Sequence, residues 1–153
     1  MDILVFSDSH GTTVPMETAI RKLNPDLVLH LGDYDADARA LATAFPRLTI
    51  RAVRGNCDFG SLTPLEDHFT IESVRVVMTH GHKYKVKSGY GDIHVMGQAE
   101  GADILLFGHT HIPYYEQIGG MHVLNPGSAN STFGHIQITE GNILCSLSVY
   151  ADL

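Results

Sequence analysis

Five short stretches of the chain place aspartate, asparagine or histidine at the end of an apolar run and beside a small residue. They are Asp8-Ser9-His10, Gly32-Asp33, Gly55-Asn56-Cys57-Asp58, His80-Gly81-His82 and Gly108-His109-Thr110-His111. Imidazole nitrogens combined with carboxylate and amide oxygens suit Mn²⁺, Fe, Zn²⁺ or Ni²⁺ better than Ca²⁺ or Mg²⁺. The residue types therefore predict a metal site built from several strand ends.

The number of donors predicts more than one ion. The candidate ligands are Asp8, His10, Asp33, Asn56, His80, His109 and His111. Seven donors exceed what one catalytic ion with an open position needs, and they fit two ions about 3.5–4 Å apart that share a carboxylate. In extended chain, residues i and i+2 project to the same side, so the pairs Asp8/His10 and His109/His111 should each aim two donors into one space. Two divalent ions among so few carboxylates leave a positive centre, which attracts a phosphate oxyanion.

The first half of the chain alternates predicted strands with predicted helices. Apolar runs predict buried strands over residues 1–7, 27–31 and 48–53, and apolar periodicity predicts helices from Thr12 or Thr13 to Leu23 and over residues 35–45. A polar stretch follows every one of these strands. Ligands gather at this end of the strands in open α/β sheets, because the loops converge there on one crevice.

The second half predicts a second sheet. Strands are expected over residues 68–71, 74–79, 103–107, 114–118, 121–124, 134–139 and 142–149, with a helix over 93–100. Neither an internal repeat nor a long linker is evident. The pattern predicts one domain over residues 1–153 that contains two sheets.

Composition narrows the class of protein. The chain has 153 residues, 44% of them hydrophobic, and a net charge of −7, which disfavours a broad surface for nucleic acid because phosphates need neutralising cations. No apolar run approaches the roughly 20 residues that span a bilayer. Cys57 and Cys145 suggest no disulfide framework. The N-terminus lacks the basic segment of a signal peptide, so the cytoplasm is the expected compartment.

The five stretches, in this order over residues 8–111, resemble the ordered motifs of the calcineurin-like metallophosphoesterases. The resemblance is closest to their small single-domain, YfcE-type branch of bacterial and archaeal phosphodiesterases, which Asn125-Pro126-Gly127-Ser128 also resembles. It implies an α/β fold, a four-layer α/β/β/α sandwich of two mixed sheets flanked by helices.

The resemblance also implies roles. Asp8, His10 and His111 would hold one ion, Asn56, His80 and His109 the other, and Asp33 would bridge both. Mn²⁺ is the favoured metal, with Ni, Fe, Zn and Mg as alternatives. A bridging hydroxide would attack phosphorus in line with the leaving oxygen. The metals and Asn56 would stabilise charge on the phosphoryl oxygens, and His80, His109 and His82 complete the candidate catalytic residues.

One position departs from the wider superfamily. Many members carry a histidine directly after the asparagine, where it can protonate the leaving group, and here that residue is Cys57. A thiol with a pKa of about 8.5 is a poor substitute. Either His82 or a water supplies the proton, or the preferred substrates are aryl or other activated esters.

The remaining polar residues receive simpler interpretations. Asp58 is expected to anchor its turn, and Asp35 and Asp37 to be helix-start residues. His30, His68, His94, His122 and His135 are interpreted as structural, Cys145 as a core residue, and Lys83, Lys85 and Lys87 as a solvated face with a minor part in steering an anionic substrate.

The function expected from all this is hydrolysis of a small phosphate diester. A phosphomonoesterase or protein phosphatase is the alternative among enzymes, and a non-catalytic scaffold like the retromer subunit of similar fold is the alternative from another class. Neither nucleic acid nor a membrane is an expected partner. A homodimer or higher homo-oligomer is consistent with the branch.

Overall fold

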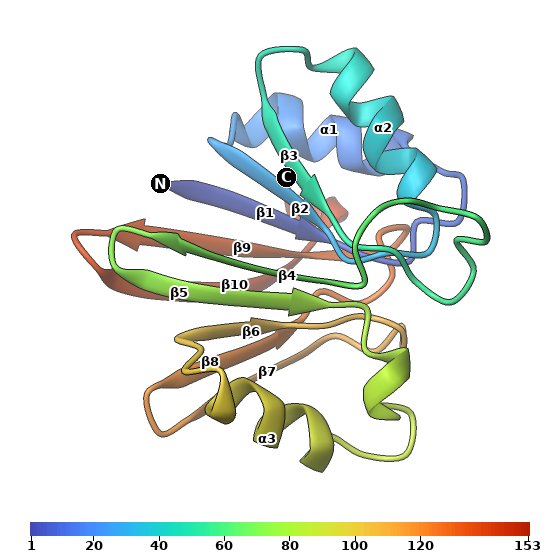
Figure 1. The fold of residues 1–153 in the computed structure, drawn as a ribbon. Helices are drawn as coiled ribbons and strands as arrows, with labels where there is room; N and C mark the ends of the chain where they lie inside the picture. Colours follow the sequence, from blue (N-terminus) through green and yellow to red (C-terminus); the bar gives the residue numbers. More distant parts are fainter.

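Two five-stranded sheets pack face to face, and helices cover their outer faces (Figure 1). The computed structural model describes residues 1–153. The first sheet has the order β10-β9-β1-β2-β3, and the second has the order β4-β5-β6-β8-β7. Helices α1 and α2 lie on the first sheet and α3 lies on the second, which confirms the predicted four-layer α/β/β/α arrangement.

The elements follow the sequence closely. The strands of the first sheet are β1 (Asp2–Phe6), β2 (Leu27–His30), β3 (Thr49–Ala52), β9 (Thr132–Thr139) and β10 (Asn142–Val149). Those of the second are β4 (Glu66–Ile71), β5 (Val74–Thr79), β6 (Ile104–Leu106), β7 (Tyr114–Ile118) and β8 (Met121–Asn125). The α-helices are α1 (Val14–Leu23), α2 (Asp35–Ala44) and α3 (Gly91–Ala99), and two short 3₁₀ turns are η1 (His82–Tyr84) and η2 (Tyr150–Asp152).

Both sheets are mixed. β1, β2 and β3 are parallel, as are β5, β6 and β8, whereas β10, β9, β4 and β7 run antiparallel to their neighbours. The parallel strands therefore end at one edge, where the loops that carry the five polar stretches meet. This edge positions the candidate site.

Alternation along the strands builds the layers. In β1, Ile3 and Val5 point into the core between the sheets, while Leu4 and Phe6 pack against α1. The core between the sheets joins side chains from both of them, among them Leu29 of the first and Leu106 of the second. None of the three α-helices has the length and hydropathy that spanning a bilayer requires.

Strand β4 differs from expectation, whereas the segment after β5 agrees with it. β4 begins at Glu66, two residues earlier than predicted. Its polar residues look like a loop in the sequence, but Asp67 forms an ion pair with Arg51 and Glu66 accepts a hydrogen bond from Tyr84. The lysines after β5 are exposed as predicted, on the turn η1 and the residues that follow it.

Replacing Leu29 should show how much the core between the sheets contributes. Leu29 is fully buried there, so Leu29→Ala is expected to lower the free energy of unfolding by about 2–5 kcal/mol. Leu144→Ala, on the exposed face of β10, is the control and should change it by about 0.5 kcal/mol or less. Chemical denaturation measures both. Equal losses in the two variants would contradict the described core.

Candidate metal centre

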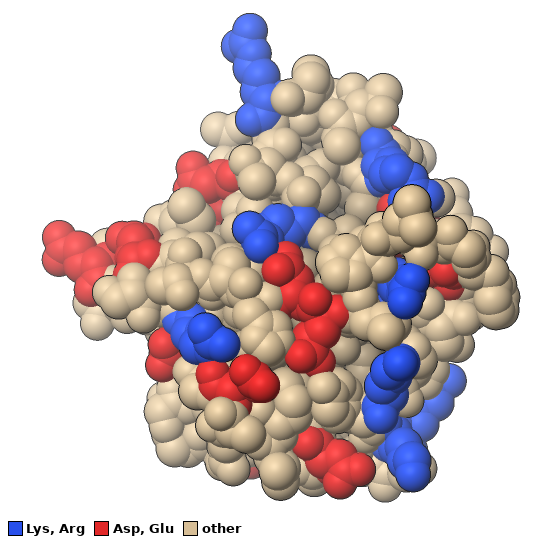
Figure 2. Space-filling model, viewed as in Figure 1, with Lys and Arg blue, Asp and Glu red and all other residues tan.

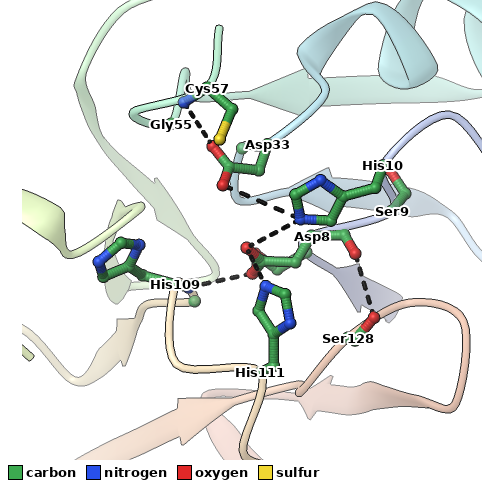
Figure 3. A network of polar contacts seen from close by, with 12 residues as sticks. Asp8, Ser9, His10, Asp33, Gly55, Cys57, His109, His111 and Ser128 are labelled. Carbon is green, nitrogen blue, oxygen red and sulfur yellow. Dashed lines mark hydrogen bonds and ion pairs between the residues drawn. The ribbon is translucent and has the colours of Figure 1, made fainter. Parts of the chain in front are cut away.

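Six of the predicted ligands meet at the carboxyl edge of the parallel strands. Figure 3 shows Asp8, His10, Asp33, His109 and His111 among them. They form two clusters, Asp8 with His10 and His111, and Asp33 with His80 and His109. Within each cluster the ligand atoms lie within 4.8 Å of one another, close enough to bind one ion together. Each cluster takes residues from both sheets, because the loops after β1 and β2 belong to the first and those after β5 and β6 to the second.

The two clusters adjoin. Asp33 Oδ2 lies 3.5 Å from His80 Nε2 in its own cluster and 4.0 Å from His10 Nε2 in the other. Asp8 Oδ1 likewise lies 3.2 Å from His111 Nε2 and 3.8 Å from His80 Nε2. The carboxylates of Asp33 and Asp8 therefore each lie within 4.0 Å of an imidazole nitrogen of the other cluster.

The donor set fits divalent metal ions. Asp8 is fully buried, and its Oδ2 accepts hydrogen bonds from Ser7 Oγ at 2.6 Å and from the backbone N–H of His109 at 3.0 Å. Its Oδ1 is buried without a hydrogen-bond donor, although it faces the nitrogens of His10, His80 and His111. A buried carboxylate oxygen without a donor is costly. A cation held between this oxygen and neutral imidazoles would satisfy it.

The backbone of the ligands is strained. The φ angles are 55° at Asp8, 49° at His10, 49° at Asp33, 71° at His109 and 62° at His111. The prediction that the two i, i+2 pairs lie in extended chain was therefore wrong, although each pair does contribute to the site. Left-handed backbone costs a non-glycine residue roughly 1–2 kcal/mol. Such strain persists only where the surroundings enforce it, and it concentrates at functional sites.

Two glycines keep the loops close enough to meet. A Cβ atom on Gly108 would lie 2.0 Å from Ser7 Oγ and 2.9 Å from Asp8 Oδ2. A Cβ atom on Gly55 would lie 2.1 Å from Asp33 Oδ1. Any side chain at either position would displace a candidate ligand, which explains why glycine stands before both polar stretches.

Charges within the site perturb its ionisable groups. Burial alone would raise the pKa of Asp33, but the His80 ring and the backbone N–H of Cys57 outweigh it and hold that pKa below its usual range. Burial opposes protonation of His80, yet the Asp33 and Asp8 carboxylates raise its pKa. Burial and the charge of His80 lower the pKa of His109 to about 4. His109 is thus uncharged at neutral pH, as a metal ligand must be.

Asn56, the seventh predicted ligand, lies at the exposed rim of this edge. Its side-chain amide donates to Cys57 Sγ at 3.7 Å, and Cys57 is itself exposed. Burial and the nearby Asp33 raise the pKa of the Cys57 thiol, which makes it a still weaker acid. Asn56 directly precedes Cys57, whose backbone N–H donates to Asp33 Oδ1 at 2.9 Å, so the residue lies on a loop that contacts the second cluster.

His82 lies against the second cluster. Its ring centroid is 5.5 Å from that of His80 and 6.2 Å from that of His109. Burial and the charge of His80 lower its pKa, and its buried Nδ1 makes no hydrogen bond. His82 is thus close enough to contact a group bound at the centre, but it is uncharged at neutral pH.

Asp58 anchors its turn, as predicted. Its Oδ2 accepts hydrogen bonds from the backbone N–H groups of Asp33 at 2.9 Å and Gly55 at 2.7 Å, and its Oδ1 accepts one from Asp35 at 3.0 Å. One carboxylate thereby joins the loop after β2 to the loop after β3.

The end of β8 and the loop after it brace the site from the other side. Buried Asn125 donates to the carbonyl of Gly108 and to Thr110 Oγ1, each at 3.0 Å, and Ser128 Oγ donates to the carbonyl of Asp8 at 3.1 Å (Figure 3). The sequence indicated a turn here that borders the pocket. Its contacts show that it holds the ligand loops in place.

A buried hydrogen-bonded network behind the ligands was missed. Ser9 Oγ donates to Asp37 Oδ2 at 2.6 Å and lies 2.8 Å from His30 Nε2, while His30 Nδ1 accepts from the N–H of Gly32 at 3.2 Å. Asp37 also accepts from the N–H of Gly11 at 2.8 Å. His30 must then donate from Nε2 to Ser9, so it is neutral, and burial lowers its pKa accordingly. Interpreting His30 as merely structural and Asp37 as a helix-start residue was incomplete.

The comparisons with known proteins agree with this geometry. Residues 1–143 match the model of the calcineurin-like phosphoesterase superfamily domain. The probable metallophosphoesterase YsnB of Bacillus subtilis is 35% identical over 131 residues, which cover 84% of this chain and 75% of YsnB. Phosphodiesterase YfcE of Escherichia coli K12 is 36% identical over 88 residues, 52% of this chain and 44% of YfcE.

Solved structures show the same fold. A conserved Streptococcus pneumoniae protein described as a predicted phosphoesterase superposes with a TM-score of 0.82 at 27% identity, over 98% of this chain and 90% of that one. Vps29 of Entamoeba histolytica, solved with Zn²⁺, gives a TM-score of 0.78 at 20% identity, over 98% and 99%. The chain therefore belongs to the calcineurin-like phosphoesterase superfamily, whose members use divalent metals.

Removing the Asp37 carboxylate should weaken the first cluster. Asp37→Ala removes the acceptor of hydrogen bonds from Ser9, which lies between Asp8 and His10, and from Gly11, which follows His10. Loss of such supporting hydrogen bonds lowers metal affinity about 10–100-fold. Calorimetric titration with Mn²⁺ should show a larger loss of affinity at one of the two sites than at the other. Asp26→Ala, which removes a carboxylate that accepts from the Asp2 N–H at the opposite edge, is the matched control. Unchanged titration of Asp37→Ala would refute the supporting role.

His30 should also make the metal-free protein sensitive to acid. Its pKa lies below the ordinary value of 6.5 in the folded state, so as the pH falls below that value the unfolded chain gains a proton that the folded protein does not. The free energy of unfolding therefore falls. In His30→Gln it should fall less steeply between about pH 7.5 and about pH 5.5. Denaturation curves of chelator-treated proteins measure this, and parallel pH profiles would contradict it.

Proposed function

We propose that the chain is a phosphodiesterase that binds two divalent metal ions and hydrolyses a small phosphate diester. The observation that carries the proposal is the pair of adjoining three-residue clusters, with the donorless oxygen of Asp8 and the carboxylate of Asp33 between them. Membership of the phosphoesterase superfamily supports the reaction class. The likeness to YfcE, which covers half of this chain, supports a diester as substrate.

The chain's own residues divide the work. Asp8, His10 and His111 hold one ion, His80, His109 and Asn56 hold the other, and Asp33 contributes to both. When bound, two such ions polarise phosphoryl oxygens and lower the pKa of water so that hydroxide is available near neutral pH. Mn²⁺ suits this mixture of imidazole and carboxylate, with Ni, Fe, Zn and Mg as alternatives.

Proton supply to the leaving group is the weak step. Cys57 has a raised pKa and His82 a lowered one, so neither is a strong acid for a departing alkoxide at neutral pH. His82 still presents a ring beside the second cluster, where it can orient a phosphoryl oxygen. We therefore infer a preference for aryl or otherwise activated esters.

We also infer that residues 1–153 act as one domain. The two sheets share the core that contains Leu29 and Leu106, and each ligand cluster draws on loops of both sheets. Neither sheet could hold a complete cluster alone. A phosphomonoesterase and a non-catalytic scaffold are the competing outcomes of the experiment below.

The deciding experiment pairs two aryl esters. Metal-stripped protein reloaded with Mn²⁺ should hydrolyse bis(p-nitrophenyl) phosphate faster than p-nitrophenyl phosphate. His109→Ala and His111→Ala should each abolish hydrolysis and lower the metal content, because each removes a ligand of a different cluster. His135→Ala is the matched control, since His135 pairs with Asp2 in the first sheet away from the centre.

Two results would overturn the proposal in different ways. Faster hydrolysis of the monoester would indicate a phosphomonoesterase. Metal uptake without hydrolysis of either ester, under any of the five metals, would favour the scaffold.

A further inference from the structure

Three lysines stand in one short segment beside the metal centre. Lys83, Lys85 and Lys87 are the only Lys or Arg in residues 76–153, and all three are exposed. None of them forms an ion pair in the structure. Figure 2 shows a group of Lys and Arg side chains at the lower right, where the turn that follows β5 lies in Figure 1. Three unpaired cations within one short segment are unusual in a protein with a net charge of −7.

The segment is fixed and not a free loop. Val86 is buried and packs against Gly81, where an added Cβ would lie 3.1 Å from Val86 Cγ2. The Tyr84 N–H donates to the carbonyl of Gly81 at 3.0 Å, and its hydroxyl donates to Glu66 at 2.6 Å. The segment is thereby tied to the stretch that carries His80.

A pocket of about 580 Å³ opens beside the same segment. One wall contains Lys87, Ser88 and Tyr90, and the other contains Thr110 and Ile112. We call it the lysine pocket. Its volume is within the range of small-molecule sites, about 300–1,000 Å³.

The lysine pocket adjoins the metal centre. Thr110 and Ile112 alternate along the chain with the candidate ligands His109 and His111, so the pocket and the two clusters share one loop. That loop is held by hydrogen bonds from Asn125 and from the Ile112 N–H to Thr110 Oγ1. A molecule whose phosphate lies at the clusters therefore has room to extend into the pocket.

We propose that the lysine pocket binds a second anionic group of the substrate, a carboxylate or phosphate carried by one of the two alcohols of the diester. Lys87 pairs with that anion, the Ser88 hydroxyl donates to it, and Val86, Tyr90 and Ile112 contact the carbon skeleton between the two anions. The proposal rests on the proposed function and narrows its substrate class to diesters with an additional negative charge. Lys87 is accordingly a residue that determines specificity.

Three p-nitrophenyl phosphodiesters test the proposal. Their second ester group is phenyl, 4-carboxyphenyl or 4-phosphonophenyl, so that only the extra anion differs. The wild-type kcat/KM should be about fivefold higher for the charged esters than for the phenyl ester, as a single exposed charge pair allows. Lys87→Gln should bring this ratio close to one, and Lys87→Arg should retain most of it. The two charged esters distinguish a carboxylate site from a phosphate site.

Matched variants separate a specific site from general attraction. Lys83→Gln lies on the same segment outside the pocket, and Lys22→Gln lies on α1, where Lys22 donates to the carbonyl of Leu153. Both should keep the ratio. If Lys83→Gln and Lys87→Gln lower the ratio equally, and added salt abolishes the wild-type preference for the charged esters, the lysines act by long-range attraction. That result would overturn the proposed pocket. Equal wild-type rates on all three esters would overturn it while leaving the proposed function intact, whereas hydrolysis of none would mean that the proposed function itself fails.

Discussion

The buried carboxylate of Asp8 is the constraint on which the site depends. One of its oxygens is fixed by Ser7 and by the backbone of His109, which lies in a loop of the other sheet, and its second oxygen is left facing imidazoles. A carboxylate in this position is destabilising by itself, because desolvation of a charge without full compensation is costly. The surrounding structure therefore has to stabilise an arrangement that local preferences oppose. The left-handed backbone of five ligands is the second sign of that opposition.

The stabilisation comes from the layers behind the ligands. Asp58 joins two loops, Asn125 and Ser128 join two others, and Ser9 connects the first ligand loop to His30 and Asp37. Asp58, Asn125 and Asp37 each make at least two of these hydrogen bonds, and the hydroxyl of Ser128 adds one more. The parallel strands add rigidity, since their ends are fixed by the sheet core. The ligands are thus held before any ion arrives.

Much of this was accessible from the sequence, and the missing part has a physical reason. Apolar runs that end in Asp or His locate the strands and the edge, because both depend on local periodicity and on the convergence of parallel strand ends. The backbone conformation of Asp8 and His109 was predicted wrongly, because the sequence does not indicate a left-handed backbone at a residue other than glycine. His30 and Ser9 are 21 residues apart in the sequence, and nothing in the local pattern indicates that their side chains form a hydrogen bond. The early start of β4 was hidden because its polar residues find partners only in the folded chain.

Each cluster takes residues from loops of both sheets, two from one sheet and one from the other, and this limits how the molecule can move. A rigid-body separation of the sheets would pull His111 away from Asp8 and Asp33 away from His80 together, so both clusters would open at once. The two sheets therefore have to stay packed against each other for either cluster to keep its three residues together.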